Sequence, residues 1–151
     1  VRFDEVFTDE MRAEVEKSGQ TIHEVLTVAS LIERETDGAD QKRIASVIYN
    51  RLNNPTAETV GLLQVDATLT YINGGRVPVE ADKQIDSPYN TYKYKGLPPG
   101  PIASPGLKAI QAAMEPEKTG YFYYVLGDDN VHHFFKTYSE MQSFMATQTR
   151  Y

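Results

Sequence analysis

The chain of 151 residues contains no cysteine, so it can form neither a disulfide nor a thiol nucleophile. It has no excess of positive charge either, since 15 lysines and arginines stand against 21 aspartates and glutamates, for a net charge of −6. No basic stripe suggests a nucleic-acid surface. No apolar run approaches the length of a membrane span, and the first residues show no signal-peptide pattern. The length and mixed charge predict one globular domain over residues 1–151.

The motifs of several common chemistries are also missing. The chain has neither the lysine that completes a phosphate-binding loop nor a G-x-S-x-G nucleophile turn. Its three histidines, His23, His132 and His133, lack metal-ligand spacing. We therefore expect neither a metal nor an organic cofactor.

Helix signals dominate the first third of the chain. Thr8 predicts a helix start and Gly19 its stop, and Thr21 with Glu24 predicts a capping box for a second helix that ends near residues 36–38. A third helix follows with apolar residues at helical spacing, and residues 53–55 break it. Asp66 could cap a short helix that ends near residue 72.

The second half of the sequence mixes loop, helix and strand signals. Residues 76–103 are rich in Pro, Gly, Asn and Tyr and predict a long structured loop, which in a compact domain is more often functional than idle. Ser104 and Ser139 are expected to open helices, the first with a buried stripe of Leu107, Ile110 and Met114. Residues 121–126 and 133–137 predict two strands with a turn at 127–130. The order indicates an α+β domain with a small antiparallel β-hairpin.

Glu33 is the first candidate for chemistry. The predicted helix is apolar almost all round from Val25 to Ile32 and runs directly into this carboxylate. Burial would raise the pKa of the Glu33 carboxyl and keep it protonated, as a general acid requires. The alternative is that Glu33 and Glu35 only begin a solvated last turn and pair with Arg34 or Lys42.

Four further segments carry candidate side chains. Gln64 and Asp66 lie where polar residues alternate with apolar ones; the alternative is a half-buried strand followed by a helix cap. Asn90 and Tyr92 lie in the Pro/Gly/Tyr-rich loop, which together with residues 96–102 suits a sugar-binding groove or a tyrosine lid on the core. His133 is a weaker candidate at the groove edge, because a histidine on a strand is more often structural.

These segments together resemble one family, the endolytic murein transglycosylases of the MltG or YceG-like type. The resemblance covers most of the chain and rests on five blocks in order, A-S-L-I-E-R-E-T (29–36), I-A-S-V-I-Y-N-R-L (44–52), L-Q-V-D-A-T (63–68), S-P-Y-N-T-Y (87–92) and G-L-P-P-G-P-I-A-S-P-G (96–106). Residues 53–60 are longer than the corresponding run in the family.

The resemblance implies a helical, lysozyme-like catalytic core that cleaves the β-1,4 bond between N-acetylmuramic acid and N-acetylglucosamine. It implies that Glu33 is the catalytic acid, which protonates the glycosidic oxygen and then accepts the proton of the muramic C6 hydroxyl, so that a 1,6-anhydro end forms. Gln64, Asp66, Asn90, Tyr92 and His133 are expected to orient the sugars. Glu35 and Ser30 are expected to have supporting roles.

Further expectations follow from the family. Its members carry a membrane anchor and a LysM-like module, so this chain resembles the catalytic domain alone and would act at the outer face of the cytoplasmic membrane. Its partners would be peptidoglycan glycan strands and cell-wall synthesis proteins, without nucleic acid, and the chain is taken as a monomer by default. Two alternatives stay open: a lysozyme-like hydrolase in which Asp66 or Glu35 is the second carboxylate, and a non-catalytic glycan-binding or scaffold domain.

Overall fold

A computed structural model describes residues 8–36 and 38–151. The elements in chain order are α2 (Asp9–Lys17), α3 (Ile22–Glu35), α4 (Gln41–Asn53), α5 (Asp66–Ile72), the 3-10 helix η1 (Glu80–Gln84), α6 (Leu107–Met114), β1 (Tyr123–Leu126), β2 (His132–Phe135) and α7 (Tyr138–Met145). The two strands pair antiparallel, with Tyr123 opposite Phe135 and Leu126 opposite His132. The α+β class and the hairpin are therefore confirmed.

The first three predicted helices are confirmed where short-range contacts define their ends. The Thr8 side chain accepts a hydrogen bond from the Met11 N–H, and Thr21 and Glu24 form the predicted reciprocal capping box on α3. The helix α4 ends at Asn53, at the predicted break. The expected end of α3 includes Asp37, which lies outside the described residues.

Three predicted helix starts are wrong in detail. The helix α6 begins at Leu107 with Gly106 as its cap, not at Ser104, and α7 is capped by Thr137 with Glu140, not by Ser139. Asp66 is the first residue of α5 and makes no capping hydrogen bond.

The predicted buried stripe of α6 is also only partly right. Leu107 is 49% exposed, whereas α6 buries Ile110 together with three alanines. The small alanine side chains let α6 pack closely against α3, the pair of helices with the most extensive contact.

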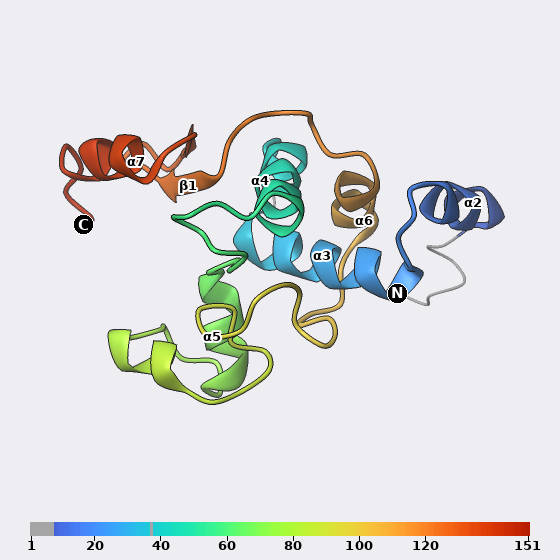
Figure 1. Ribbon diagram of the computed structural model, residues 1–151, viewed down its shortest axis with the longest axis horizontal. Helices are drawn as coiled ribbons and strands as arrows, with labels where there is room; N and C mark the ends of the chain where they lie inside the picture. Colours follow the sequence, from blue (N-terminus) through green and yellow to red (C-terminus); the bar gives the residue numbers. More distant parts are fainter. Residues whose placement is uncertain (1–7, 37) are drawn as a thin grey trace.

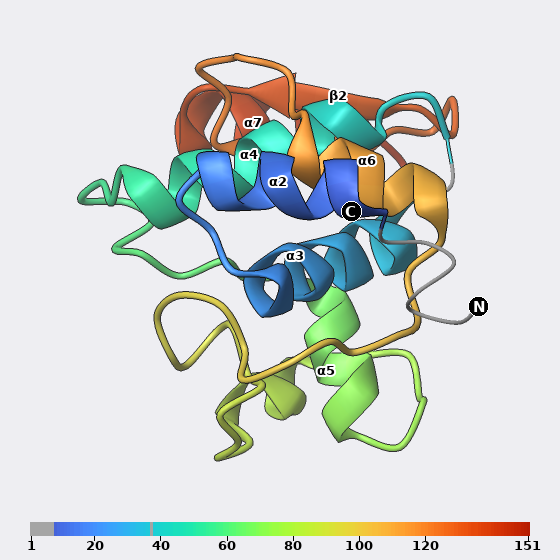
Figure 2. The same cartoon turned by 90° about the vertical axis from the view of Figure 1, so that its right-hand side faces the viewer.

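The centre of the molecule is α3. Figures 1 and 2 show α4, α6 and the hairpin on one side of this helix, and α5 with the loop that follows it on the other. Seven consecutive or near-consecutive residues of α3 are buried, namely Val25, Thr27, Val28, Ala29, Ser30, Leu31 and Ile32. The prediction that this helix is buried all round is confirmed, and its C-terminal residue Glu35 reaches the junction of the layers.

The segment 73–106 joins α5 to α6 and contains one short helix, η1. Side chains of α3 hold its second half: the Ser30 hydroxyl accepts the Ile102 N–H at 3.0 Å, and the His23 ring lies 2.6 Å from the Pro99 carbonyl oxygen. These bonds hold the segment against α3, opposite the hairpin layer (Figure 2). None of the described helices is both long and apolar enough to span a membrane.

Candidate active site

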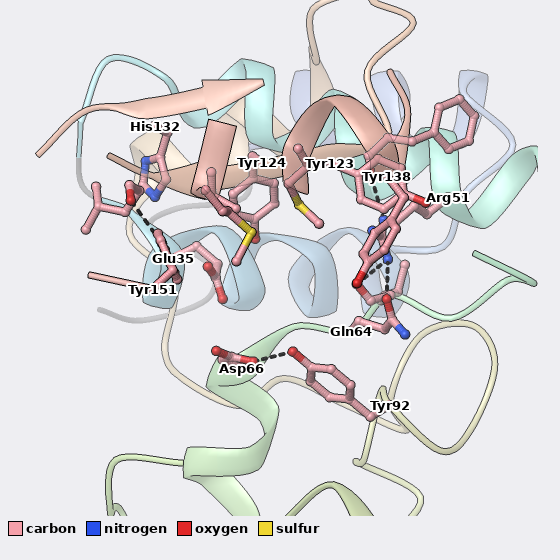
Figure 3. Close-up of a pocket in the computed structure, with 16 residues that line it drawn as sticks. Glu35, Arg51, Gln64, Asp66, Tyr92, Tyr123, Tyr124, His132, Tyr138 and Tyr151 are labelled. Carbon is pink, nitrogen blue, oxygen red and sulfur yellow. Dashed lines mark hydrogen bonds between the residues drawn. The ribbon is translucent and has the colours of Figure 1, made fainter. Parts of the chain in front are cut away.

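A pocket of about 450 Å³ lies where the end of α3, the start of α5 and the hairpin with α7 meet (Figure 3). Its polar lining comes from Glu35, Arg51, Gln64, Asp66 and Tyr92, and four further tyrosines contribute to it, namely Tyr123, Tyr124, Tyr138 and Tyr151. A second hollow, lined by Arg34, Thr70 and Tyr71 among others, shares Glu35 and Asp66 with the first. The two hollows therefore share this pair of carboxyl groups, and we call the two hollows together the groove.

Glu35 has the most perturbed carboxyl group of the groove. Burial raises its pKa from 4.5 to about 7, and the nearby charge of Asp66 adds to the effect. Hydrogen bonds from the Tyr124 hydroxyl and from the Ala67 backbone N–H act in the opposite direction, because they stabilise the charged form. A carboxyl group that is half protonated near neutrality can both donate and accept a proton.

Asp66 and Tyr92 lie across the pocket from Glu35 (Figure 3). The Tyr92 hydroxyl donates a hydrogen bond to an Asp66 carboxylate oxygen. Burial and the Asp66 carboxylate both raise the pKa of Tyr92, so this phenol stays a donor at physiological pH. Asp66 is thus held as an exposed, oriented carboxylate that faces Glu35.

Arg51 and Gln64 form another wall of the pocket. The Arg51 Nη1 group donates to the Gln64 Oε1 atom at 3.2 Å and to the backbone oxygens of Leu62 and Leu63. Gln64 has a φ of 54°, in the left-handed region that few residues other than glycine adopt. Such strain persists only where surrounding contacts hold it, and it clusters at functional sites.

Glu33 lies elsewhere and lines neither hollow. Its Oε1 atom accepts the Gly106 N–H at 2.7 Å, at the start of α6. Two residues on a helix are separated by about 200°, so Glu33 and Glu35 face different neighbours. The structure brings Glu35, not Glu33, together with Gln64, Asp66 and Tyr92.

Asn90 requires a correction. It is 0% exposed, and its amide donates to the Lys83 and Ile85 carbonyl oxygens while its oxygen accepts the Tyr92 N–H at 3.0 Å. A side chain with this burial and these partners cannot contact a sugar, so Asn90 acts by holding the loop that presents Tyr92.

Ser30 is equally buried, and its bond to the Ile102 N–H fits the expected supporting role.

His133 also lies away from the pocket. Its ring stacks on Phe144 and its Nε2 atom lies 3.0 Å from an Asp129 carboxylate oxygen. The neighbouring His132 lines the pocket instead, with its Nδ1 atom 2.7 Å from an Asp40 carboxylate oxygen. Adjacent strand residues point to opposite faces of a sheet, so only one of the two histidines can face the pocket, and it is His132 rather than the expected His133.

The pocket residues that we did not single out from the sequence include Arg51, Tyr124 and His132. Arg51 did leave a signal, because it continues the apolar stripe of α4 through Ile44, Val47 and Ile48. A charged side chain on a buried helical face must have hydrogen-bonding or charged partners, which marks it as a candidate for a functional or structural site. Tyr124 left no comparable signal among the chain's 10 tyrosines.

A groove lined by two facing carboxyl groups and several tyrosines is the kind of site that glycan-cleaving proteins use. The chain belongs to the YceG-like family, whose model matches residues 1–147.

It is 43% identical over 138 residues to the endolytic murein transglycosylase of Bacillus subtilis, covering 89% of this chain and 37% of that protein. It is 40% identical over 114 residues to the protein of that name from Streptococcus pneumoniae, covering 74% of this chain and 21% of the relative.

A crystal structure of a YceG-like protein from Listeria monocytogenes superimposes on this fold with a TM-score of 0.79 at 40% identity. The match covers 89% of this chain and 43% of that one. The chain therefore spans well under half the length of these relatives. Among the described residues, no group of three or more His, Cys, Asp or Glu side chains could hold a metal ion.

Proposed function

We propose that this chain is the catalytic part of a lytic transglycosylase that cleaves peptidoglycan glycan strands. Family membership and the names of the relatives support the class of reaction. The observation that carries the assignment to this groove is the Glu35 carboxyl group, with a pKa of about 7, beside Asp66 and Tyr92. The proposed bond is the β-1,4 link between N-acetylmuramic acid and N-acetylglucosamine.

Glu35 replaces Glu33 as our choice of acid. Protonated Glu35 donates its proton to the glycosidic oxygen, which leaves with the N-acetylglucosamine as the bond to the muramic C1 atom breaks. The Glu35 carboxylate then takes the proton of the muramic C6 hydroxyl, and the C6 oxygen bonds to C1 to close the 1,6-anhydro ring. An attached nucleophile has an entropic advantage over water of roughly 7–11 kcal/mol when well oriented.

Asp66 has a different part in this reaction. Its carboxylate carries negative charge on the groove wall facing Glu35 and is fixed there by Tyr92. Such a charge stabilises a developing oxocarbenium ion without having to form a bond. The same charge opposes ionisation of Glu35, so Asp66 also keeps the acid protonated.

The experiment is mass spectrometry of the soluble products from purified glycan strands with the wild type, Glu35→Gln and Glu33→Gln. We expect anhydro-ended fragments from the wild type and from Glu33→Gln, and a loss of at least about 100-fold in Glu35→Gln. The opposite ranking of the two variants would restore Glu33 as the acid. Equal cleavage by all three proteins would remove both residues from the mechanism.

A lysozyme-like hydrolase is the second candidate, because Asp66 provides a second carboxyl group in the same groove. In that case Asp66 would act as nucleophile or activate a water molecule. Reducing-ended products, abolished equally by Glu35→Gln and Asp66→Asn, would favour the hydrolase. Anhydro ends with partial activity in Asp66→Asn would favour the transglycosylase.

Family membership alone supports two wider proposals. We place the reaction at the outer face of the cytoplasmic membrane, with cell-wall synthesis proteins as partners. Fractionation of cells and cross-linking of the native protein test both.

A further inference from the structure

Arg51 is immobilised at the pocket wall. It is 7% exposed, its Nε atom donates to the Phe122 carbonyl oxygen at 2.6 Å, and its guanidinium carbon lies 4.8 Å from the centre of the Tyr123 ring. Its Nη1 atom contacts two further carbonyl oxygens and Gln64. A guanidinium held by these contacts cannot swing into solvent, so it presents its Nη1 donor to Gln64 in a fixed position.

The orientation of the Gln64 amide follows from this contact. Arginine has only donors, so Gln64 must turn its carbonyl oxygen toward Arg51 and its NH₂ group away. The backbone of Gln64 is held in its left-handed conformation by hydrogen bonds from the Gln64 N–H to the Thr91 carbonyl oxygen, at 3.1 Å, and from the Val65 N–H to the Thr91 hydroxyl, at 2.9 Å. Within residues 8–36 and 38–151, no group accepts a hydrogen bond from the Gln64 NH₂.

We propose that Gln64 binds an amide carbonyl oxygen of the glycan through its NH₂ group, and that Arg51 is the positioning residue that fixes this polarity. The NH₂ group of Gln64 has only donors, so it pairs best with a strong acceptor. On an N-acetylated sugar, the strongest neutral acceptor is the carbonyl oxygen of the acetamido group. Hydroxyl groups both donate and accept and would not select this orientation. The inference rests on the proposed glycan substrate but not on its cleavage.

Such carbonyls belong either to the acetamido groups of the sugars or to the amides of the stem peptide, including the one that joins it to the sugar. The test is isothermal titration calorimetry with the full chain in a background that carries both Glu33→Gln and Glu35→Gln, so that cleavage is suppressed whichever of the two glutamates is the acid. The ligands are peptide-free strands, N-acetylated or de-N-acetylated, and peptide-bearing N-acetylated strands. The comparison variant is Gln64→Met, which keeps the length and the unbranched shape of the side chain but has no donor.

The acetamido group is the expected partner. We expect Gln64→Met to reduce the preference for N-acetylated over de-N-acetylated strands about 3- to 10-fold, the range of one net hydrogen bond. Each protein is described by the ratio of its affinities for N-acetylated and de-N-acetylated strands. Effects of the free amine that do not involve Gln64 are the same in both proteins and cancel when the two ratios are compared. A reduced preference for peptide-bearing strands instead would support the same donor with the stem amide as its source. If both preferences equal those of the parent, the proposal is overturned.

Arg51→Lys tests the positioning role. Lysine keeps the charge but not the planar donor fork that bonds to the Phe122, Leu62 and Leu63 carbonyl oxygens, so its ammonium group is no longer fixed against the Gln64 Oε1 atom and the amide loses its fixed orientation. We expect Arg51→Lys to reduce the same preference as Gln64→Met, and the combined variant to show no further reduction, because Arg51 acts through Gln64. Additive losses in the combined variant would contradict this role, and circular dichroism spectra establish that each variant is folded.

Discussion

At the scale of single residues, the groove works through a carboxyl group that is largely withdrawn from water. Glu35 is polar and lies at a helix end, but Tyr124, Asp66 and Ala67 surround its carboxyl group, and the pKa rises to about 7. An acid with this pKa is still largely protonated just below neutrality and is easily deprotonated again. One side chain can therefore serve both proton transfers in the proposed reaction.

The pH profile of the reaction should report this pKa. The first step needs protonated Glu35, so we expect kcat/KM for glycan strands to fall above pH 7, approaching tenfold per pH unit. Initial rates between pH 5 and 9 provide the measurement, with Tyr92→Phe as a control that removes the hydroxyl group bound to Asp66 but keeps Glu35. A rate that stays constant up to pH 9 would contradict the assignment of Glu35 as acid.

The free energy of unfolding should also vary with pH because of the raised pKa of Glu35. The pKa of Glu35 is higher in the folded protein than its ordinary value of 4.5, so the folded state binds the proton more tightly. This contribution is fully present below pH 4.5 and is lost as the pH rises through about 7, a change of up to about 3 kcal/mol. Glu35→Gln has no proton to lose, so its advantage over the wild type should grow from pH 4.5 to 7 and then level off. Thermal unfolding at four pH values tests this, and a difference that does not vary with pH would refute it.

At the scale of elements, the two glutamates at the end of α3, Glu33 and Glu35, have different roles. Glu35 faces the groove, whereas the Glu33 carboxylate accepts the Gly106 N–H at the start of α6. A carboxylate at the first turn of a helix satisfies an unpaired N–H and interacts favourably with the helix dipole. We infer that Glu33 holds α6 against α3 and so supports the helix that carries the acid.

Removal of Glu33 should therefore cost stability. We expect Glu33→Ala to lower the free energy of unfolding by about 1–2 kcal/mol, as the loss of a helix cap does. Gly106→Ala should act in the same direction, since its new methyl group would lie 3.1 Å from the Glu33 Oε1 atom.

Urea unfolding gives the measurement, with Glu16→Ala on the exposed face of α2 as the matched control. An effect no larger than that of the control would contradict the capping role.

At the scale of the whole molecule, α3 joins two halves that each supply one side of the groove. The hairpin and α7 provide tyrosines on one side, while α5 and the segment 73–106 provide Asp66 and Tyr92 on the other (Figures 1 and 3). The second side lacks extended secondary structure between α5 and α6 and depends on side-chain contacts. Asn90 is the buried centre of these contacts.

Asn90→Ala should loosen this half of the groove. The change leaves the Lys83 and Ile85 carbonyl oxygens and the Tyr92 N–H without their partner, and it opens a cavity. We expect a loss of roughly 2–4 kcal/mol in stability and faster proteolysis within residues 73–106. Asn90→Asp keeps the acceptor for the Tyr92 N–H but turns a carboxyl oxygen toward the Lys83 and Ile85 carbonyl oxygens in a fully buried site, so it should destabilise the protein at least as much as Asn90→Ala. Stability within 0.5 kcal/mol of the wild type, on the order of a surface substitution, would argue against this role.

The sequence alone determined what depends on neighbours along the chain. The capping box of Thr21 and Glu24, the cap at Thr8 and the end of α4 each involve residues within a few positions, so local chemistry defines them. The burial of residues 25–32 follows from a helix that is apolar all round, and the five sequence blocks were sufficient for the family.

Tertiary structure alone decided which residues meet in the groove. Glu33 and Glu35 have the same side chain on the same turn, and their difference comes from what packs against each, Gly106 against one and Tyr124 with Ala67 against the other. Likewise, His132 rather than His133 faces the pocket because of the strand register, and Asn90 is buried by backbone that folds over it. The environment of a carboxyl group depends on residues distant in sequence, so its pKa becomes readable only once the chain has folded.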